Sequence, residues 1–172
     1  MDIIDYSNRR GVLVAFLPKI HAITKENVSK DKLTLMTPPE HFVTWQHKMR
    51  RVLVDIKRRF IVAVDGDVLA GIFFYRYGDE GKIFIEDAQT AWAYRNNPRV
   101  MDGFLKKLEY DKATKDATFY ASERIKIAAD QEMLAKRGAT LITHEDGWEK
   151  LGTFAEMATA IKLRYNRGTS SG

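Results

Sequence analysis

The stretch that most constrains the fold of this chain is residues 58–95, where three runs rich in β-branched and aromatic residues are separated by glycine-containing breaks. The first break is Asp65-Gly66, and an Asp-Gly pair between two such runs predicts a β-hairpin with a type I′ turn, in which both central residues need positive φ. A second break, at residues 78–81, leads into the third run. The stretch therefore predicts three consecutive antiparallel strands, which form a meander.

The third run is longer than one regular strand. It extends from Lys82 to Tyr94, whereas strands in globular proteins rarely exceed about 10 residues. We therefore expect an interruption, such as a β-bulge, near Asp87-Ala88.

A strand and a helix are expected at the start of the chain. Residues 2–6 have the composition of a short strand, and Ser7 or Asn8 then begins a helix whose apolar residues recur at helical spacing. Pro18 lies inside this pattern, so it either kinks the helix or marks the point where the helix restarts. Residues 25–36 are polar and have no clear period, which predicts a loop.

A second helix is expected after Thr37-Pro38-Pro39-Glu40, a sequence with the form of a capping box and with proline at the first helical position. Its apolar residues fall on one stripe, which predicts an amphipathic helix packed on the sheet. A cofactor-binding aromatic box is the weaker alternative for this stripe. The stripe consists of Phe42, Trp45, Met49, Val52 and Leu53.

Helices and strands are expected to alternate after the meander. Asn97-Pro98 places an N-cap residue and an N1 proline at the start of a helix, and residues 117–121 then have the composition of a strand. A further helix at about residues 128–137 ends at Gly138, because glycine is favoured at the C′ position, and a strand follows at residues 140–143. The buried stripe of the first of these helices is expected to be Met101, Phe104, Leu105 and Leu108.

The last patterned segment, residues 157–165, is ambiguous. Its alanine and methionine content favours a helix, whereas the alternation of Ile161, Leu163 and Tyr165 favours a strand, and we prefer the strand. Residues 168–172 are expected to form a disordered tail. The remaining residues, 1–167, are expected to form a single domain.

The composition agrees with one globular domain, since 45% of the 172 residues are hydrophobic and 30% are charged. The chain has no cysteine, which excludes disulfides and cysteine metal sites and is compatible with a cytoplasmic location. No apolar run is long enough to cross a bilayer. The four histidines show no metal-ligand spacing, so no metal site is expected.

The net charge of +5 is a modest basic excess, which permits an anionic partner without requiring one. Basic residues concentrate at residues 47–51 and 57–59, and we interpret them first as a solvated face. A nucleic-acid-binding surface is the alternative. It would consist of Arg50, Arg51, Lys57, Arg58 and Arg59.

The order of the expected elements, together with two short motifs, resembles the GNAT acyltransferase superfamily. The motifs are the hairpin at residues 64–71 and the helix end at residues 133–139, and the resemblance extends from about residue 3 to residue 165. It implies an α+β fold with a mixed, mostly antiparallel central sheet flanked by helices. It also implies acetyl-CoA as the cofactor, bound in a splay between the central strands.

In the family, the cofactor pyrophosphate lies on amides at the start of the helix after the meander, where the signature is Arg/Gln-x-x-Gly-x-Gly/Ala. If Arg99 opens this motif, Asp102 and Phe104 stand where small residues are expected, and Gly103 is one place out of register. The resemblance gives five candidate cofactor-binding residues, with core or rim packing as the alternative for the tryptophan. They are Trp92, Arg95, Arg99, Asp102 and Gly103.

The resemblance also suggests catalytic residues. Many members use a carboxylate on the last strand of the meander as a general base, which corresponds here to Glu86 with Asp87 beside it. Adjacent strand residues face opposite ways, so only one of the two is expected to enter the cleft. The family's general acid, often a tyrosine, falls on Leu134, and Tyr120 is the nearest substitute. Structural pairing of Glu86 and aromatic packing of Tyr120 are the alternatives.

Two functions follow from the resemblance. The first is an acetyltransferase that moves an acetyl group from acetyl-CoA to an amine acceptor. The second is a catalytically inactive GNAT-like protein that binds a protein partner or has a structural role, a kind of protein familiar among bacteriophage products. The degenerate glycine motif and the missing acid favour the second, and the carboxylate at Glu86 favours the first.

Overall fold

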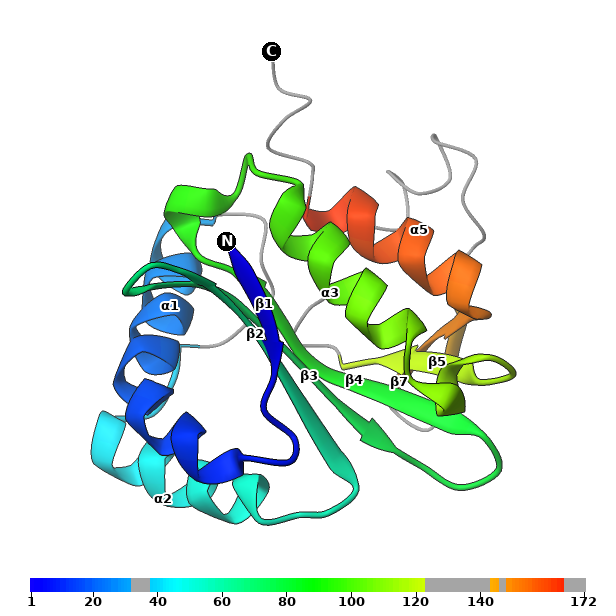
Figure 1. Ribbon diagram of the computed structural model, residues 1–172, viewed down its shortest axis with the longest axis horizontal. Coiled ribbons are helices and arrows are strands. Elements are labelled where there is room, and N and C mark those ends of the chain that lie inside the picture. The colour runs from blue at the N-terminus through cyan, green and yellow to red at the C-terminus, as the bar shows by residue number, and fades with distance from the viewer. Residues whose placement is uncertain (32–37, 123–142, 146–147, 166–172) are drawn as a thin grey trace.

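The computed structural model describes residues 1–31, 38–122, 143–145 and 148–165. Within these residues, seven strands form one sheet in the order β1-β2-β3-β4-β5-β7-β6 (Figure 1). All neighbouring strands are antiparallel except β4 and β5, which are parallel. The strands are β1 (Asp2–Asp5), β2 (Arg58–Asp65), β3 (Val68–Tyr77), β4 (Lys82–Thr90), β5 (Thr118–Ala121), β6 (Thr143–Glu145) and β7 (Trp148–Gly152).

Helices cover both faces of the sheet. The helices α1 (Leu17–Lys30) and α2 (Phe42–Leu53) lie on one face, and α3 (Arg99–Glu109) and α5 (Phe154–Tyr165) lie on the other (Figure 1). This arrangement confirms the expected α+β fold with a mixed, mostly antiparallel sheet flanked by helices. Three short 3-10 helices complete the described elements: η1 (Arg10–Phe16), η2 (Trp92–Tyr94) and η3 (Lys112–Thr114).

The central strands separate two hydrophobic cores, because side chains alternate along each strand. On β2, Phe60 and Val62 pack toward α1 and α2, whereas Ile61 packs toward α3 and α5. All three side chains are almost fully buried. Strands buried on both faces explain why the runs of the meander are continuously apolar in sequence.

The meander is confirmed, but its first turn differs from the expected type. The pairing of Asp65 with Val68 makes Gly66 and Asp67 the central residues, and of these two only Gly66 has positive φ, at 61°. One positive φ, at the first central position, is typical of a type II′ turn rather than type I′. The turn with two consecutive positive φ values is the second one, at Glu80 (56°) and Gly81 (73°).

A β-bulge interrupts β4, as the length of the third run predicts. Phe74 on β3 pairs with Asp87, whereas the next residue, Tyr75, pairs with Ile85, so Glu86 is the extra residue of the bulge. The interruption thus lies beside the expected position. Bulges of this kind re-aim side chains and often occur next to active sites.

The beginning of the chain differs from expectation in two places. Residues 10–16 form the 3-10 helix η1, and Pro18 marks the start of α1, where a missing amide costs nothing. The expected loop at residues 25–36 is wrong in its first part, because α1 continues to Lys30. Residues 32–37 lie outside the described part of the chain.

The expected capping box is also wrong. The helix α2 begins at Phe42, after both prolines, and no side chain caps it. Glu40 instead pairs with Lys48, and its carbonyl oxygen lies 2.8 Å from Nε2 of His21. The amphipathic character of α2 holds, since its apolar residues pack against the core on this face of the sheet.

In the second half of the chain, the expected start of α3 is confirmed, whereas the strand expected at residues 157–165 is wrong. The side chain of Asn97 accepts a hydrogen bond from the amide of Arg99 at 3.0 Å, as expected for the start of α3. Residues 157–165, expected as a strand, belong to the helix α5, which buries Met157, Ala160 and Ile161 at helical spacing. The expected elements at 128–137 and 140–142, the motif at 133–139, and the tail at 168–172 lie outside the described residues.

Candidate active site

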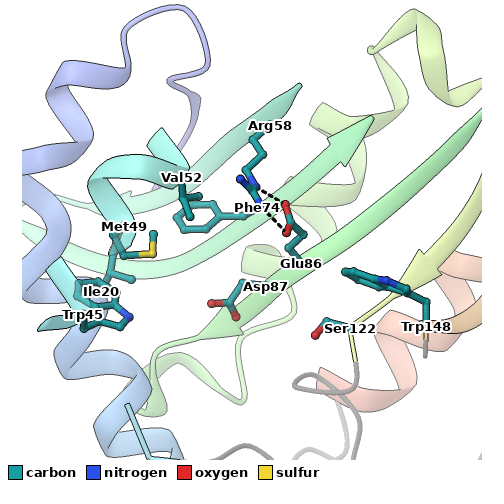
Figure 2. Close-up of a pocket in the computed structure, with 10 residues that line it drawn as sticks. All are labelled: Ile20, Trp45, Met49, Val52, Arg58, Phe74, Glu86, Asp87, Ser122 and Trp148. Atoms are coloured by element: carbon teal, nitrogen blue, oxygen red, sulfur yellow. Dashed lines mark hydrogen bonds and ion pairs between the residues drawn. The ribbon is translucent and has the colours of Figure 1, made fainter. Parts of the chain in front are cut away.

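A pocket opens beside the bulge of β4, on the face of the sheet that α1 and α2 cover (Figure 2). Its volume is about 170 Å³. The described residues that line it come from α1, α2, three neighbouring strands, the end of β5 and β7. They are Ile20, Trp45, Met49, Val52, Arg58, Phe74, Glu86, Asp87, Ser122 and Trp148.

One wall of the pocket is the apolar stripe of α2. Trp45, Met49 and Val52 are only half-buried, because the helix presents them to the pocket as well as to the core. Trp148 forms the opposite end and packs edge-on against Phe84 at 4.9 Å between ring centroids. The stripe interpreted from the sequence as core packing therefore also forms a wall of the candidate site.

The bulge turns both neighbouring carboxylates, Glu86 and Asp87, into this pocket (Figure 2). The expectation that only one of them enters the cleft is wrong. It assumes regular alternation along the strand, and the extra residue in β4 breaks that alternation.

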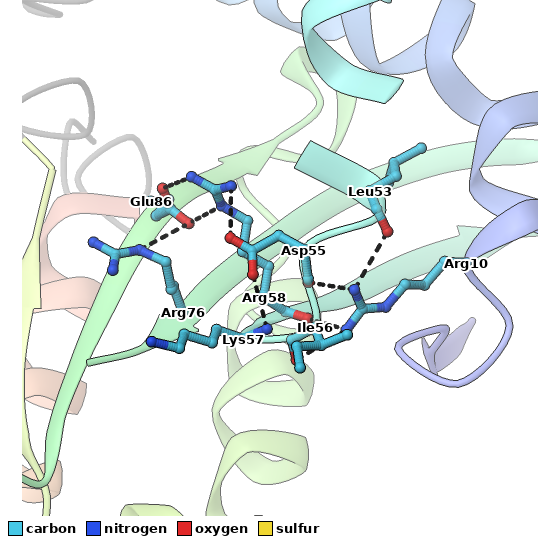
Figure 3. Close-up of polar contacts among 8 residues, drawn as sticks. All are labelled: Arg10, Leu53, Asp55, Ile56, Lys57, Arg58, Arg76 and Glu86. Atoms are coloured by element: carbon cyan, nitrogen blue, oxygen red, sulfur yellow. Dashed lines mark hydrogen bonds and ion pairs between the residues drawn. The ribbon is translucent and has the colours of Figure 1, made fainter. Parts of the chain in front are cut away.

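Glu86 is clamped by arginine. Nε of Arg58 donates to Oε1 of Glu86 at 2.7 Å and Nη2 donates to Oε2 at 3.2 Å, and Arg76 approaches Oε1 at 3.8 Å (Figure 3). The hydrogen bond to Glu86 raises the pKa of Arg58 against the opposing effect of burial. A carboxylate held in this two-pronged pairing is well suited to fix strands together, because both of its oxygens already accept from the guanidinium.

Asp87 is held by a neutral amide. Nε2 of Gln89 lies 3.1 Å from Oδ1 and 3.3 Å from Oδ2 of Asp87, and it also donates to Oγ1 of Thr24 at 2.8 Å. Nδ2 of Asn27 donates to Oε1 of Gln89 at 3.2 Å, which fixes the orientation of the glutamine amide. Thr24, Asn27 and Gln89 are each 2% exposed, so a buried polar chain runs from α1 to Asp87.

Arg10 fixes the segment that carries Arg58. Its guanidinium donates to the carbonyl oxygens of Leu53 and Ile56, each at 3.3 Å, and of Arg58 at 2.6 Å, and it also bonds that of Asp55 (Figure 3). These bonds satisfy carbonyls at the end of α2 and in the turn that follows it. Sequence reasoning missed Arg10, because its partners lie 43 to 48 residues further along the chain.

Tyr120 lies next to the pocket but is not among the residues that line it. Its ring is 3% exposed and stacks on Phe84 at 5.3 Å. The structure thus supplies the aromatic packing that was the alternative for this residue. A role for Tyr120 as general acid stays a prediction.

Three of the candidate cofactor residues lie near the start of α3. Arg95 pairs with Asp31 at 2.5 Å, and its guanidinium lies 4.8 Å from the ring of Trp92. This pair joins the end of α1 to the segment after β4. Arg99 is exposed, and its side chain is available at the helix N-terminus, where an anion is favoured.

The other two candidates, Asp102 and Gly103, have structural surroundings. Asp102 lies 3.9 Å from Nζ of Lys162 on α5. A Cβ atom at Gly103 would lie 2.6 Å from Cγ1 of Ile3, so glycine allows α3 to approach β1 closely. The structure thus offers a packing reason for Gly103, while its role in cofactor binding stays a prediction.

The strand β5 pairs with only the first part of β4. The two strands pair only from Lys82 to Ile85 on β4, and the last bond joins the amide of Ser122 to the carbonyl of Ile85 at 2.9 Å. Among the described residues, the part of β4 beyond the bulge pairs with β3 alone. In this described part of the chain, the pairing of β4 with β5 thus ends beside the pocket, while a cofactor site between these strands stays a prediction.

The basic residues considered for nucleic-acid binding do not form one surface. Arg58 pairs with Glu86 on one face of the sheet, while Arg59 lies 3.6 Å from Asp5 and lines a cavity on the other face. Arg50, Arg51 and Lys57 are exposed.

Comparison with solved structures identifies the architecture. An acetyltransferase from Thermus thermophilus matches 80% of this chain and 88% of its own, with a TM-score of 0.58 and 12% identity. The PaiA N-acetyltransferase from Thermoplasma acidophilum, solved in complex with coenzyme A, matches 87% of this chain and 96% of its own, with a TM-score of 0.57 and 13% identity. The chain has the GNAT acetyltransferase fold.

A third similar structure is the spermidine N-acetyltransferase SpeG from Vibrio cholerae, with a TM-score of 0.54 and 13% identity over 87% of this chain and 92% of its own. No family model matches the sequence, and no curated protein matches it either. The likeness is thus one of fold, and the chemistry must be argued from the site.

The described part of the chain contains no group of three or more histidine, aspartate or glutamate side chains arranged to hold a metal ion. None of the helices in the same residues combines the length and the apolar character needed to cross a membrane.

Proposed function

We propose that this protein transfers an acetyl group from acetyl-CoA to an amine that enters the pocket beside the β4 bulge. The observation that carries the proposal is the bulge itself. It turns Glu86 and Asp87 into a pocket beside the point where the described pairing of β4 with β5 ends. A carboxylate there meets the need of acetyl transfer for a base, since an amine must lose a proton to become acylated.

Within this proposal, Asp87 is the better base and Glu86 the better structural residue. Both oxygens of Glu86 accept hydrogen bonds from Arg58, so protonation of Glu86 would break the clamp between β2 and β4. Asp87 is oriented by the neutral amide of Gln89. Because Glu86 is committed to Arg58 and fixes the floor of the pocket, the proposal gives the proton of the acceptor ammonium to the neighbouring carboxylate of Asp87.

Acetyl-CoA, when bound, supplies an activated thioester. Among the described residues, β4 beyond the bulge has no strand beside it on the β5 side, and this edge suits the pantetheine amides. The N-terminus of α3 with Arg99 suits a phosphate. As the new C–N bond forms, the C–S bond breaks and the coenzyme leaves as the thiol. Tyr120 is kept as a candidate donor of that last proton.

The cofactor part of the proposal is tested by thermal unfolding with and without millimolar acetyl-CoA. A ligand present at 100 times its dissociation constant stabilises a protein by about 2.7 kcal/mol, so the melting temperature is expected to rise. Arg99→Ala is expected to reduce the rise, whereas Arg50→Ala, which removes the same charge from the exposed side of α2, leaves it unchanged. An unchanged melting temperature of the wild-type protein would refute the cofactor assignment.

The second candidate function, a GNAT-like binding protein without catalysis, is favoured by one observation. Asp102 and Phe104 occupy the positions of the family's small residues, and Phe104 is fully buried in the core, where it serves packing. Release of coenzyme A thiol in the presence of an amine distinguishes the two functions. A binding protein would show no release of coenzyme A thiol with any amine, even where acetyl-CoA raises its melting temperature.

A further inference from the structure

We infer that the acceptor amine is a small arylalkylamine, that is, one aromatic ring joined to a primary ammonium by a short alkyl chain. The inference rests on the proposed function and narrows its substrate class. Three features of the pocket carry it: the aromatic walls, the position of Asp87 between them, and the volume.

The walls of the pocket are aromatic and preorganised. The indole of Trp45 is held by His21, at 5.1 Å between ring centroids, and by Phe42, at 6.1 Å. At the far end, Phe84 supports the indole of Trp148 from one side. Side chains fixed in this way offer flat apolar surfaces that lose little freedom when a ring packs against one of them.

The charge in the pocket lies between these surfaces. Figure 2 shows the indoles of Trp45 and Trp148 at opposite ends of the pocket, with the carboxylate of Asp87 between them. A ligand that fills the apolar end therefore brings a group on a short chain to the carboxylate. An ammonium suits this place, because it pairs with Asp87 and is also attracted by the face of an indole.

The volume of the pocket suits a ligand with one ring. The pocket measures about 170 Å³, and an engineered apolar cavity of about 150 Å³ binds benzene. A ring with a chain of two or three atoms thus fills the pocket. A polyamine would instead need carboxylates spaced along a channel, whereas the two carboxylates among the described lining residues, Glu86 and Asp87, are adjacent.

The probe for this inference is 2-phenylethylamine, and its binding is measured by calorimetry with and without bound coenzyme A. Three comparison ligands each lack one feature: 2-phenylethanol lacks the charge, butylamine lacks the ring, and spermidine replaces the ring by further amines. We expect 2-phenylethylamine to bind at least tenfold more tightly than each of them. The same order is expected in kcat/KM for thiol release from acetyl-CoA.

Substitutions of pocket residues test whether 2-phenylethylamine binds in this pocket. Trp45→Ala is expected to weaken the binding of 2-phenylethylamine at least fivefold and to leave the affinity for butylamine unchanged. Trp45→Phe, which keeps an aromatic ring, is expected to retain most of the wild-type affinity for 2-phenylethylamine. Tyr110→Ala, which removes a ring that is 75% exposed outside this pocket, is the matched control and leaves both ligands unchanged. If Trp45→Ala does not fold, Trp45→Phe and Asp87→Asn carry the test, and Asp87→Asn is expected to weaken the amine but not the alcohol.

The outcomes separate this inference from the proposed function. Acetyl transfer to spermidine with no measurable binding of 2-phenylethylamine would overturn the arylalkylamine assignment and leave acetyl transfer intact. Tight binding of 2-phenylethylamine without any transfer would support the ligand class and refute the enzyme. Equal affinity for 2-phenylethylamine and butylamine would also overturn the inference, because the aromatic walls would then contribute nothing.

Discussion

The guanidinium of Arg58 grips both carboxylate oxygens of Glu86, at 2.7 Å and 3.2 Å, and so joins β2 to the bulge of β4 across the intervening strand β3. Both side chains are about three-quarters buried, at 25% and 24% exposed. The pair therefore stabilises the floor of the pocket, and the neighbouring Asp87 is the base that we propose.

Glu86→Gln tests this division of roles. It leaves the charge of Arg58 partly buried without its main partner, so the free energy of unfolding should fall by about 1–3 kcal/mol. Turnover at saturating substrate should fall less than about tenfold, because the base is retained, whereas loss of a general base typically costs about 100-fold or more. Denaturant unfolding and steady-state kinetics check the two effects. A loss of turnover with unchanged stability would make Glu86 the base.

Gln89→Leu tests the buried polar chain that holds Asp87. The substitution keeps a similar volume but removes the hydrogen bonds to Asp87 and Thr24 and one of the two acceptors of the Asn27 amide, the other being the carbonyl oxygen of Thr90. Unsatisfied buried groups cost about 1–3 kcal/mol each, so stability should fall. The kcat should fall as well while the dissociation constant of acetyl-CoA stays unchanged, because the carboxylate is no longer oriented. Gln46→Leu on α2 is the control, and equal effects of the two variants would refute the positioning role.

Gly103→Ala separates packing from cofactor binding. The added methyl would lie 2.6 Å from Cγ1 and 2.7 Å from Cδ1 of Ile3. Overpacking costs about 1–3 kcal/mol, which exceeds the gain of about 1 kcal/mol from replacing glycine by alanine in a helix. The melting temperature should therefore fall, and Ile3→Ala in the same chain should restore part of it. Gly11→Ala, which meets no atom within 4 Å, is the control.

The same variant measures the cofactor role expected for Gly103 from the sequence. If the packing account holds, acetyl-CoA binds Gly103→Ala as tightly as it binds the wild-type protein. A tenfold weaker affinity with an unchanged melting temperature would place Gly103 in the phosphate site instead.

The raised pKa of Tyr77 predicts a loss of stability at alkaline pH. Burial and the hydrogen bond to Asp111 raise the pKa of Tyr77 to about 12, above the value of about 10 in unfolded chains. The folded state holds this proton more tightly, so the contribution to stability is complete below pH ~10 and is lost as the pH rises through ~12. Unfolding by denaturant at pH 8, 10 and 12 measures the loss, and Tyr77→Phe should reduce it. An equal loss in the variant would contradict this account.

Local signals account for what the sequence predicted well. The start of α3 depends on a hydrogen bond from the amide of Arg99 to the side chain of Asn97, only two residues away. The interruption of β4 follows from the length of the third apolar run alone. Local signals also explain the failures. In α5, Ile161 and Leu163 satisfy a strand period by chance, while the burial of Met157, Ala160 and Ile161 follows the helix period.

The site was less predictable, because tertiary contacts build it. Glu86 was found through the family resemblance, but its clamp by Arg58 joins residues 28 positions apart, and no local pattern encodes it. The bulge was predictable from the length of the third run. Its consequence, that Glu86 and Asp87 both enter one pocket, depends on which residue of β4 is the extra one, and strand pairing decides that.

The central claim is most directly tested by comparing the wild-type protein with Asp87→Asn in acetyl transfer. Acetyl-CoA and 2-phenylethylamine are mixed with each protein, and thiol release and the acetylated amine are measured together. The account predicts amine-dependent transfer by the wild-type protein, and a kcat at least about 100-fold lower in Asp87→Asn, with an unchanged affinity for acetyl-CoA. Full activity of Asp87→Asn would contradict the account, and so would a wild-type protein that binds acetyl-CoA but acetylates no amine.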